Sequence, residues 1–396
     1  MLSNRQLFLH SIAQTSSSPL MLEIEKAEGV YLVDINGKKY IDLISGISVS
    51  NIGHRHPAVL KAIHKQLDKY MHLMVYGEYI QSPQIELAEK LKNTLPKRLD
   101  NLYFVNSGSE ATEGAMKLVK RYTGRTEIIS YKQAYHGSTQ GALSLMGDEY
   151  FKQSYRPLLP DTKQISLNDF QELALITSNT AAVFIEPIQG EAGVRIPNPE
   201  YMLKLRTKCS EMGALLVVDE IQTGFGRTGK FWAFEHFNIE PDIILTAKGM
   251  GGGMPIGAFI APKEIMASLS FEPVLGHITT FGGHPVSCAA AAATVDVLVN
   301  EKLIESVFEK EAFIRSQLIH PSIKEIRSKG LLIAVEFENY TILKAIIDKA
   351  IEKGLITDWF LFCDNSMRIA PPLTITIEEL KVACSIILES INEVVA

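Results

Sequence analysis

The chain has 396 residues, of which 46% are hydrophobic, and a formal net charge of −6. This is enough apolar material for one large or two medium cores, and the lack of a basic excess or a Lys/Arg-rich block argues against nucleic acid as a partner. No apolar run approaches the roughly 20 residues of a membrane span, and the N-terminus lacks a signal-peptide pattern, so we expect a cytoplasmic protein with no membrane contact.

The predicted elements change character along the chain. Residues 29–43 hold two alternating strands around an Asn36-Gly37 turn, which predicts a hairpin. From residue 102 to 261, uniformly apolar runs alternate with helical patterns, which is typical of a parallel sheet buried on both faces. Beyond His284, long helices enclose the strand-like segment 324–338. The expected strands are 102–105, 127–131, 182–187, 214–220, 242–245 and 257–261; the expected helices are 109–122, one after Pro199, and about 284–299, 301–318, 341–353 and 376–393.

These elements predict an α/β protein with two domains. A large α/β domain would span 51–283, and a smaller α+β domain would span 284–396. The N-terminal segment, 1–50, would pack with the small domain. The four cysteines Cys209, Cys288, Cys363 and Cys384 form no CxxC pair, so we expect reduced, buried thiols and no metal site.

Lys248 stands between an expected strand and a glycine-rich loop, in LTAKGMGGGMPIGA (245–258). Loss of solvation at a strand end favours the neutral amine of a lysine, which is the state that forms a Schiff base. A surface lysine or a phosphate-binding lysine would also fit this position. The neighbouring motifs must therefore decide between these possibilities.

Asp219 closes the expected strand ALLVVD, and the carboxyl ends of parallel strands are where ligand-binding groups collect. A loop or capping carboxylate is the simpler alternative. A nucleotide-binding site is a further one, because GFGRTGKF (224–231) resembles a phosphate-binding loop. That motif requires Ser or Thr where this chain has Phe231, and it requires a strand before the loop and a helix after it.

Ser107, Gly108 and Ser109 follow the strand at 102–105 and begin a helix. The backbone N–H groups and the positive end of such a helix can bind a phosphate, although a simple Ser cap with Glu113 in the first turns explains the pattern equally well. Tyr135 and His136 lie in a Gly-flanked loop, QAYHGST, where an aromatic ring can cover a flat ligand or pack in the core.

Together these residues supply what pyridoxal phosphate requires. The cofactor needs a lysine for a covalent bond, an acid at its ring nitrogen, a phosphate site and an aromatic ring against its face. Lys248, Asp219, Ser107–Ser109 and Tyr135 provide one of each, from the strand ends of one domain.

The sequence resembles the class III pyridoxal-phosphate aminotransferases over nearly its whole length, and within them the acetylornithine and ornithine aminotransferase branch. The strings that carry the resemblance are NSGSEATE, YHG, EPIQGEAGV (186–194), VVDEIQTGFGRTG (217–229), LTAKGMGGGMPIGA, TTFGGHP (279–285) and RIAPPL (368–373). The resemblance implies the fold-type I architecture, with a mixed, mostly parallel seven-stranded sheet and a homodimer whose active sites lie at the subunit boundary.

The resemblance also assigns roles to individual residues. Lys248 would bond the cofactor, Asp219 would face its ring nitrogen, Gln222 would reach its ring hydroxyl, and Tyr135 would stack on its ring. Gly108 and Ser109 would hold the phosphate, which Thr280 of the neighbouring subunit would also reach. His136 and Glu186 would belong to the same cofactor site.

Substrate binding is assigned in the same way. Arg368 would grip an α-carboxylate, and Glu191 would mask that arginine when an ω-amino group occupies the site; an ordinary ion pair is the alternative. The implied activity moves an amino group between an (ω-)amino acid of the acetylornithine, ornithine or 4-aminobutyrate kind and a 2-oxo acid such as 2-oxoglutarate or pyruvate.

Two positions depart from this branch. Ser138 stands where an arginine usually holds the distal carboxylate of glutamate or acetylornithine, and Ile278 replaces a small residue before the TT pair. Loss of one charge-paired contact in a dry pocket costs about 2–5 kcal/mol, enough to change the preferred substrate. An aminomutase or racemase, or a cofactor-bound protein without turnover, would share the same lysine and acid.

Overall fold

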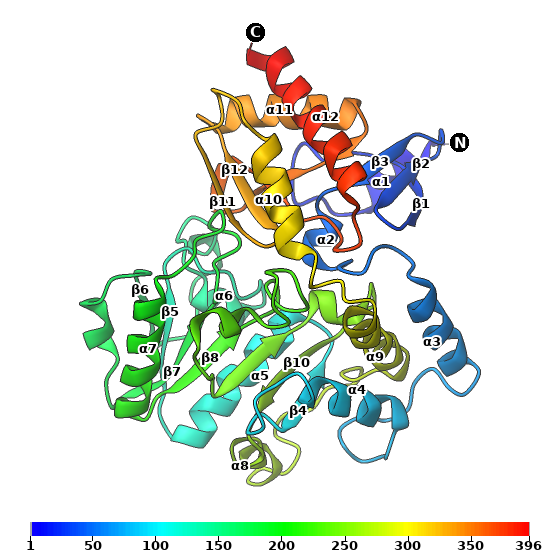
Figure 1. The fold of residues 1–396 in the computed structure, drawn as a ribbon. Coiled ribbons are helices and arrows are strands. Elements are labelled where there is room, and N and C mark those ends of the chain that lie inside the picture. The colour runs from blue at the N-terminus through cyan, green and yellow to red at the C-terminus, as the bar shows by residue number, and fades with distance from the viewer. Residues whose placement is uncertain (1, 396) are drawn as a thin grey trace.

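The computed structural model describes residues 2–395, in which three β-sheets form the framework (Figure 1). The large sheet has seven strands in the order β4-β10-β9-β8-β7-β5-β6. β10 runs antiparallel to both neighbours and the other pairs are parallel, which confirms the predicted mixed, mostly parallel sheet. The strands are β4 (Asn101–Val105), β5 (Glu127–Tyr131), β6 (Thr162–Ile165), β7 (Thr180–Ile185), β8 (Leu215–Asp219), β9 (Ile243–Thr246) and β10 (Gly257–Ala261).

Both faces of this sheet are covered. Successive side chains along each strand point to opposite sides, and each side packs in its own apolar cluster. In β8, Leu215 and Val217 pack in the apolar cluster that contains α5 (Gly108–Thr123). Leu216 and Val218 pack in a second cluster that contains residues of α7 (Pro199–Met212). A strand buried on both sides has no polar face, which explains the uniformly apolar runs in the sequence.

The remaining helices around the large sheet include α9 (Pro285–Asn300), which packs against α3 (Pro57–Leu67) and α4 (Ser82–Lys92). Shorter helices are α6 (Gln140–Leu145), α8 (Lys263–Met266) and the 3₁₀ turns Gln153–Tyr155, Glu172–Leu175, Ala233–Phe237, Lys248–Gly251 and Ala267–Ser270. The division into 1–50, 51–283 and 284–396 stays a prediction. That division assigns α9 to the C-terminal domain, but α9 packs against helices α3 and α4 of the large part (Figure 1).

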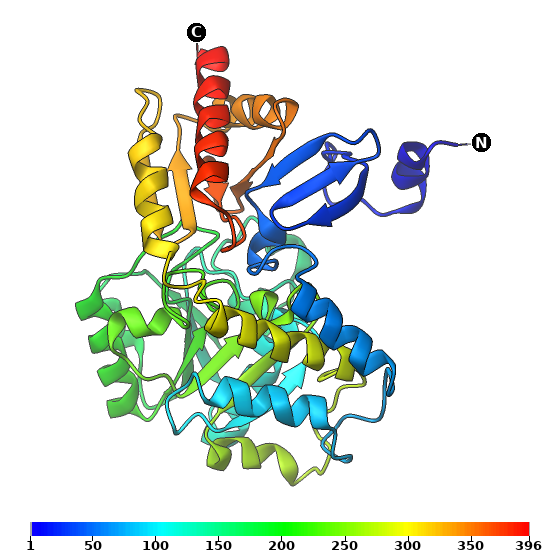
Figure 2. The same cartoon turned by 45° about the vertical axis from the view of Figure 1, so that its right-hand side comes forward.

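The C-terminal part contains an antiparallel sheet in the order β11-β12-β15-β14. The strands of this sheet are β11 (Glu325–Lys329), β12 (Leu332–Glu336), β14 (Asp358–Phe360) and β15 (Cys363–Ile369). The helices of the C-terminal part are α10 (Val307–Gln317), α11 (Tyr340–Glu352) and α12 (Ile377–Val395). The N-terminal strands β1 (Ile24–Glu28), β2 (Tyr31–Asp34) and β3 (Lys39–Asp42) lie beside it, because β3 pairs in parallel with β13 (Leu355–Ile356). Figure 2 shows α1 (Asn4–Ser11) at the outer end of these strands; α2 (Ser45–Ser48) follows β3.

Most predicted elements are present, with three kinds of difference. The helix expected at 301–318 begins at Val307, because Lys302 has a positive φ of 52° and residues 301–306 form turns. β1, β6 and β13–β15 were not predicted, since they are short or carry polar residues, and the helices α1–α4, α6 and α8 were not predicted either. Cys209, Cys288 and Cys384 are buried as expected, whereas Cys363 is only half-buried. Among residues 2–395, no helix combines the length and apolarity that crossing a membrane requires.

Candidate active site

Polar residues from five segments meet at the carboxyl edge of the large sheet. β4, β5, β7, β8 and β9 are mutually parallel, so the segments that follow them emerge on the same side. They surround a cavity of about 420 Å³. Its lining includes Ser107, Gly108, Ser109, Tyr135, His136, Glu186, Asp219, Gln222 and Lys248, which the sequence had nominated.

The start of α5 forms one wall of this cavity. Ser107 is the N-cap, and its Oγ accepts a hydrogen bond from Glu110 N at 3.2 Å, so the capping alternative is correct for its side chain. A Cβ added to Gly108 would lie 2.8 Å from Ile221 Cδ1, which keeps this position small. Glu113 does not cap α5 and instead accepts hydrogen bonds from Gly141 N and Ala142 N. Ser107, Gly108 and Ser109 all line the cavity, so the positive end of α5 faces it.

Asp219, at the end of β8, is held by two hydrogen bonds. His136 Nδ1 lies 2.7 Å from Asp219 Oδ2, and Ile221 N donates to Asp219 Oδ1 at 2.9 Å. Burial lowers the pKa of His136, but the adjacent Asp219 outweighs this effect and the pKa is raised. His136 therefore holds the Asp219 carboxylate in a fixed orientation at the edge of the cavity.

Glu186 follows β7 and is fully enclosed. Its carboxylate accepts hydrogen bonds from Tyr135 N at 2.9 Å and Gly190 N at 3.1 Å. Burial raises its pKa to about 7, and the charge of Asp219 adds to that rise. Glu186 thus fixes the backbone of two loops that border the cavity.

Lys248 lies two residues beyond β9, with its side chain lining the cavity. Burial lowers the pKa of its ammonium group, and this lowering prevails although nearby carboxylates, Glu191 foremost, oppose it. Its φ of 44° is unusual for a residue with a side chain and indicates a constrained backbone. Gly252 follows with φ 58°, and a Cβ there would lie 2.3 Å from Thr294 Oγ1, so the loop needs glycine at this point.

Arg368 and Glu191 form a buried, two-pronged ion pair beside the cavity. Arg368 Nη1 lies 2.7 Å from Glu191 Oε1, and Nη2 lies 3.0 Å from Oε2. Gln222, which lines the cavity, donates to Glu191 Oε1 at 3.3 Å and so links the pair to it. Burial alone would raise the pKa of Glu191, but Arg368 lowers it to about 2.

A second carboxylate, which no sequence pattern predicted, contacts Arg368. Asp358 Oδ1 accepts from Arg368 Nε at 2.8 Å, and the Phe360 ring lies 4.5 Å from the guanidinium carbon. Burial raises the pKa of Asp358 to about 6, although Arg368 opposes this. The segment TDWF gives no signal of this contact, because it depends on Asp358 and Arg368 facing each other across β14 and β15.

Besides Glu191 and Arg368, which lie beside the cavity, three further positions singled out from the sequence lie outside its wall in this chain. Ser138 is exposed, and its hydroxyl lies 3.0 Å from that of Tyr135. Thr280 and Ile278 are exposed as well. The phosphate-loop alternative at 224–231 is wrong, because Arg227 is fully buried there and donates to the carbonyl oxygens of Leu331 and Pro371.

Comparison with known proteins gives one consistent family. The profile of the family described as aminotransferase class-III matches residues 12–391. The chain is 39% identical to the acetylornithine aminotransferase of Methanopyrus kandleri over 360 residues, 90% of each chain. It is also 39% identical to that of Bacillus subtilis over 370 residues, which covers 92% of this chain and 93% of the relative.

Solved structures agree over the same range. A transaminase from the marine bacterium Virgibacillus superposes with a TM-score of 0.92 at 29% identity, covering 98% of both chains. The ornithine aminotransferase of Toxoplasma gondii ME49 superposes with a TM-score of 0.91 at 31% identity, covering 99% of this chain and 96% of that one. The similarity therefore includes the whole architecture as well as the motifs at the cavity.

Proposed function

Because this chain belongs to the class-III aminotransferase family, we propose that it moves an amino group between an (ω-)amino acid and a 2-oxo acid. The enzyme uses pyridoxal phosphate and has the type I fold, both as the motifs predicted. Its similarity to known relatives identifies it as an aminotransferase of the acetylornithine/ornithine type. The donors we propose are acetylornithine-like, ornithine-like or 4-aminobutyrate-like, and the acceptor 2-oxoglutarate or pyruvate. One observation carries the proposal: a single cavity collects Lys248, Asp219 and the start of α5.

The residues of the cavity fit the cofactor. The N-terminus of α5, with Gly108 and Ser109, offers backbone N–H groups and a hydroxyl to a phosphate. Asp219 would face the ring nitrogen, Gln222 the ring hydroxyl and Tyr135 the ring. His136 acts through Asp219, and Glu186 acts through the Tyr135 and Gly190 backbone.

Lys248 is the residue that we propose to move the proton. Pyridoxal phosphate supplies a carbonyl that bonds amines and a ring that stabilises negative charge on the adjoining carbon. Lys248 Nζ removes the proton from the amine-bearing carbon of the substrate, a task that needs the neutral amine. Burial favours that neutral form, which supports the assignment.

We propose that Arg368 binds the α-carboxylate of one substrate and that Glu191 covers Arg368 while an ω-amino substrate reacts. The two-pronged pair between them supports this role, since it occupies the guanidinium face that a carboxylate would need. Asp358 keeps Arg368 in place from the other side when Glu191 moves away.

The quaternary structure and the location of the enzyme are part of the proposal. We propose a homodimer in which Thr280 of one subunit completes the phosphate site of the other. Thr280 is exposed and lies outside its own cavity wall, which is consistent with such a role. The cytoplasm stays the predicted location.

Two measurements on the purified holoenzyme test the proposal. Borohydride reduction followed by peptide mapping is expected to label Lys248, and a label on a different lysine would contradict the site. A panel of amines with 2-oxoglutarate or pyruvate is expected to release an oxo product and a new amino acid. A racemase or aminomutase would return the amine to the same molecule, so absence of both products would favour that alternative.

A further inference from the structure

A second cavity, of about 980 Å³, lies between the large sheet and the C-terminal sheet. One side is formed by loops that follow β5, β6 and β7, and the other by α10 and β11. It shares no lining residue with the cavity that contains Lys248. The proposed aminotransferase reaction therefore leaves this cleft without a role.

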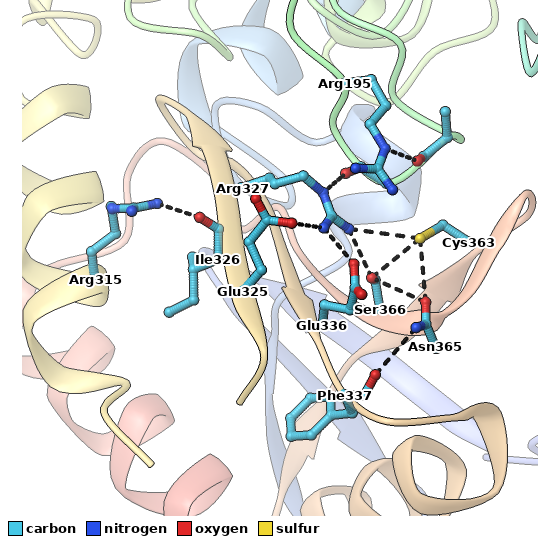
Figure 3. Close-up of polar contacts among 12 residues, drawn as sticks. Arg195, Arg315, Glu325, Ile326, Arg327, Glu336, Phe337, Cys363, Asn365 and Ser366 are labelled. Atoms are coloured by element: carbon cyan, nitrogen blue, oxygen red, sulfur yellow. Dashed lines mark hydrogen bonds and ion pairs between the residues drawn. The ribbon is translucent and has the colours of Figure 1, made fainter. Parts of the chain in front are cut away.

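Positive charge predominates in the lining of the cleft. The lining contains one carboxylate, Glu311, and four cationic side chains. The cations are Lys132, Arg195, Arg315 and Arg327. Arg327 is already balanced by ion pairs with Glu325 and Glu336, and Lys132 lies 3.8 Å from Glu172 (Figure 3 shows the Arg327 pairs). Arg195 and Arg315 are the two other cations of the cleft.

Neither Arg195 nor Arg315 has a carboxylate oxygen within 4.0 Å among residues 2–395. Arg195 donates through Nε to Ala192 O at 3.2 Å, and Arg315 donates through Nη1 to Ile326 O at 2.8 Å (Figure 3). Both Nη groups of Arg195 and the Nη2 group of Arg315 remain available for an anion. A guanidinium group that lines a cavity with free N–H donors matches a carboxylate or a phosphate.

We propose that this cleft binds a small dianion, with its charge on carboxylate or phosphate groups, through Arg195 and Arg315. Apolar side chains between the polar ones, including Val194, Ile196 and Ile326, would contact a short carbon chain. Glu311 offsets only part of the attraction, because it is one carboxylate against two guanidinium groups, and its oxygens are occupied by hydrogen bonds from Ser328 Oγ and Gly330 N.

The cleft is connected to the active site through one loop. Gln189 and Arg195 pair through an isolated antiparallel β-bridge, which closes the loop 189–195, and Glu191 lies inside this loop. Arg327 Nε donates to Gly193 O at 2.7 Å, and Arg195 Nε donates to Ala192 O. A dianion on the free Nη groups of Arg195 would stabilise this loop, and with it the pairing of Glu191 with Arg368. This coupling rests on the proposed function, whereas the binding does not.

Isothermal titration calorimetry of the holoenzyme at constant ionic strength tests the binding, with succinate and inorganic phosphate as separate probes. At least one probe is expected to bind, and Arg195→Gln and Arg315→Gln are each expected to weaken it at least tenfold. Arg156→Gln, which removes an exposed arginine that lines neither cavity, is the matched control. Far-UV spectra and Tm verify that each variant is folded.

Three outcomes would overturn the proposal. The first is that neither probe binds. The second is that either cleft variant binds as tightly as the wild type. The third is that binding is lost only in Arg368→Gln, which would locate the probe in the active site. Which probe binds identifies the anionic group. The coupling is tested by the KM of an α-amino donor, which the bound probe should raise in the wild type more than in Arg315→Gln. An equal rise in both would contradict the coupling, and turnover measured without probe shows independently whether the enzyme is an aminotransferase.

Discussion

Replacement of Glu191 by glutamine tests the proposed gate most directly. In the wild type, an α-carboxylate can reach Arg368 only after the Glu191 carboxylate has left its two guanidinium nitrogens. Glutamine has nearly the same volume but no charge. It can accept one hydrogen bond from Arg368 and keep the one with Leu361 N, which in the wild type is 3.1 Å long.

The size of the effect follows from the pKa of Glu191. Arg368 holds it at about 2, against an ordinary value of 4.5. At about 1.4 kcal/mol per pKa unit, this difference corresponds to about 3 kcal/mol in favour of the ionised, paired state. That figure is the net of the burial penalty and the attraction of Arg368, and only part of it is released to a substrate, because Asp358 continues to hold Arg368 in Glu191→Gln. We therefore expect the KM of an α-amino donor to fall by roughly 10- to 100-fold.

The assay measures each half-reaction separately, from the change in visible absorbance of the holoenzyme after mixing with one substrate. The KM of an α-amino acid is expected to fall in Glu191→Gln, and the KM of an ω-amine to rise, because Arg368 is then uncovered beside it. Glu200→Gln, at an exposed position of α7, is the control. An unchanged KM for both classes of substrate would refute the gate.

Three further predictions address the substrate, the dimer and the pH dependence. Ser138→Arg is expected to raise kcat/KM for glutamate relative to alanine at least tenfold, because serine offers no charge to a distal carboxylate. A wild type that already strongly prefers glutamate and acetylornithine, and gains nothing from the arginine, would contradict this. Mixing inactive Lys248→Ala with an inactive Thr280→Ala variant should restore part of the activity through dimers that hold one intact site, and full turnover by a monomer would contradict the shared site. Burial raises the pKa of Glu220 to about 7 from 4.5, so between these pH values the unfolded chain ionises while the folded chain stays protonated, and wild-type stability falls as the pH rises. The free energy of unfolding of Glu220→Gln, relative to that of the wild type, should therefore rise by up to about 3 kcal/mol as the pH increases from 4.5 to 7. Urea denaturation at several pH values measures this difference. A difference that does not change with pH would contradict the assignment.

Local patterns in the sequence identified six of the seven strands of the large sheet and most of the polar residues that line the cavity at its carboxyl edge. A strand buried on both faces is apolar throughout, so polar residues with chemical roles stand where the chain leaves the sheet. Asp219, Lys248 and Ser107 could be found for this reason, and the parallel direction of their strands implied that they meet at one edge. The family motifs then added the Arg368–Glu191 pair.

Contacts between distant segments were decided only by the tertiary structure. Asp358 meets Arg368 because β14 and β15 pair in one particular register, and no pattern in TDWF specifies that register. His136 reaches Asp219 across 83 residues of sequence. The cationic cleft exists because the loop that carries Arg195 faces the helix that carries Arg315, and each arginine by itself looks like an ordinary surface residue. The physical reason is the same in all three cases: periodicity reports which side chains are buried, whereas the partner of a polar side chain depends on how separate elements pack together.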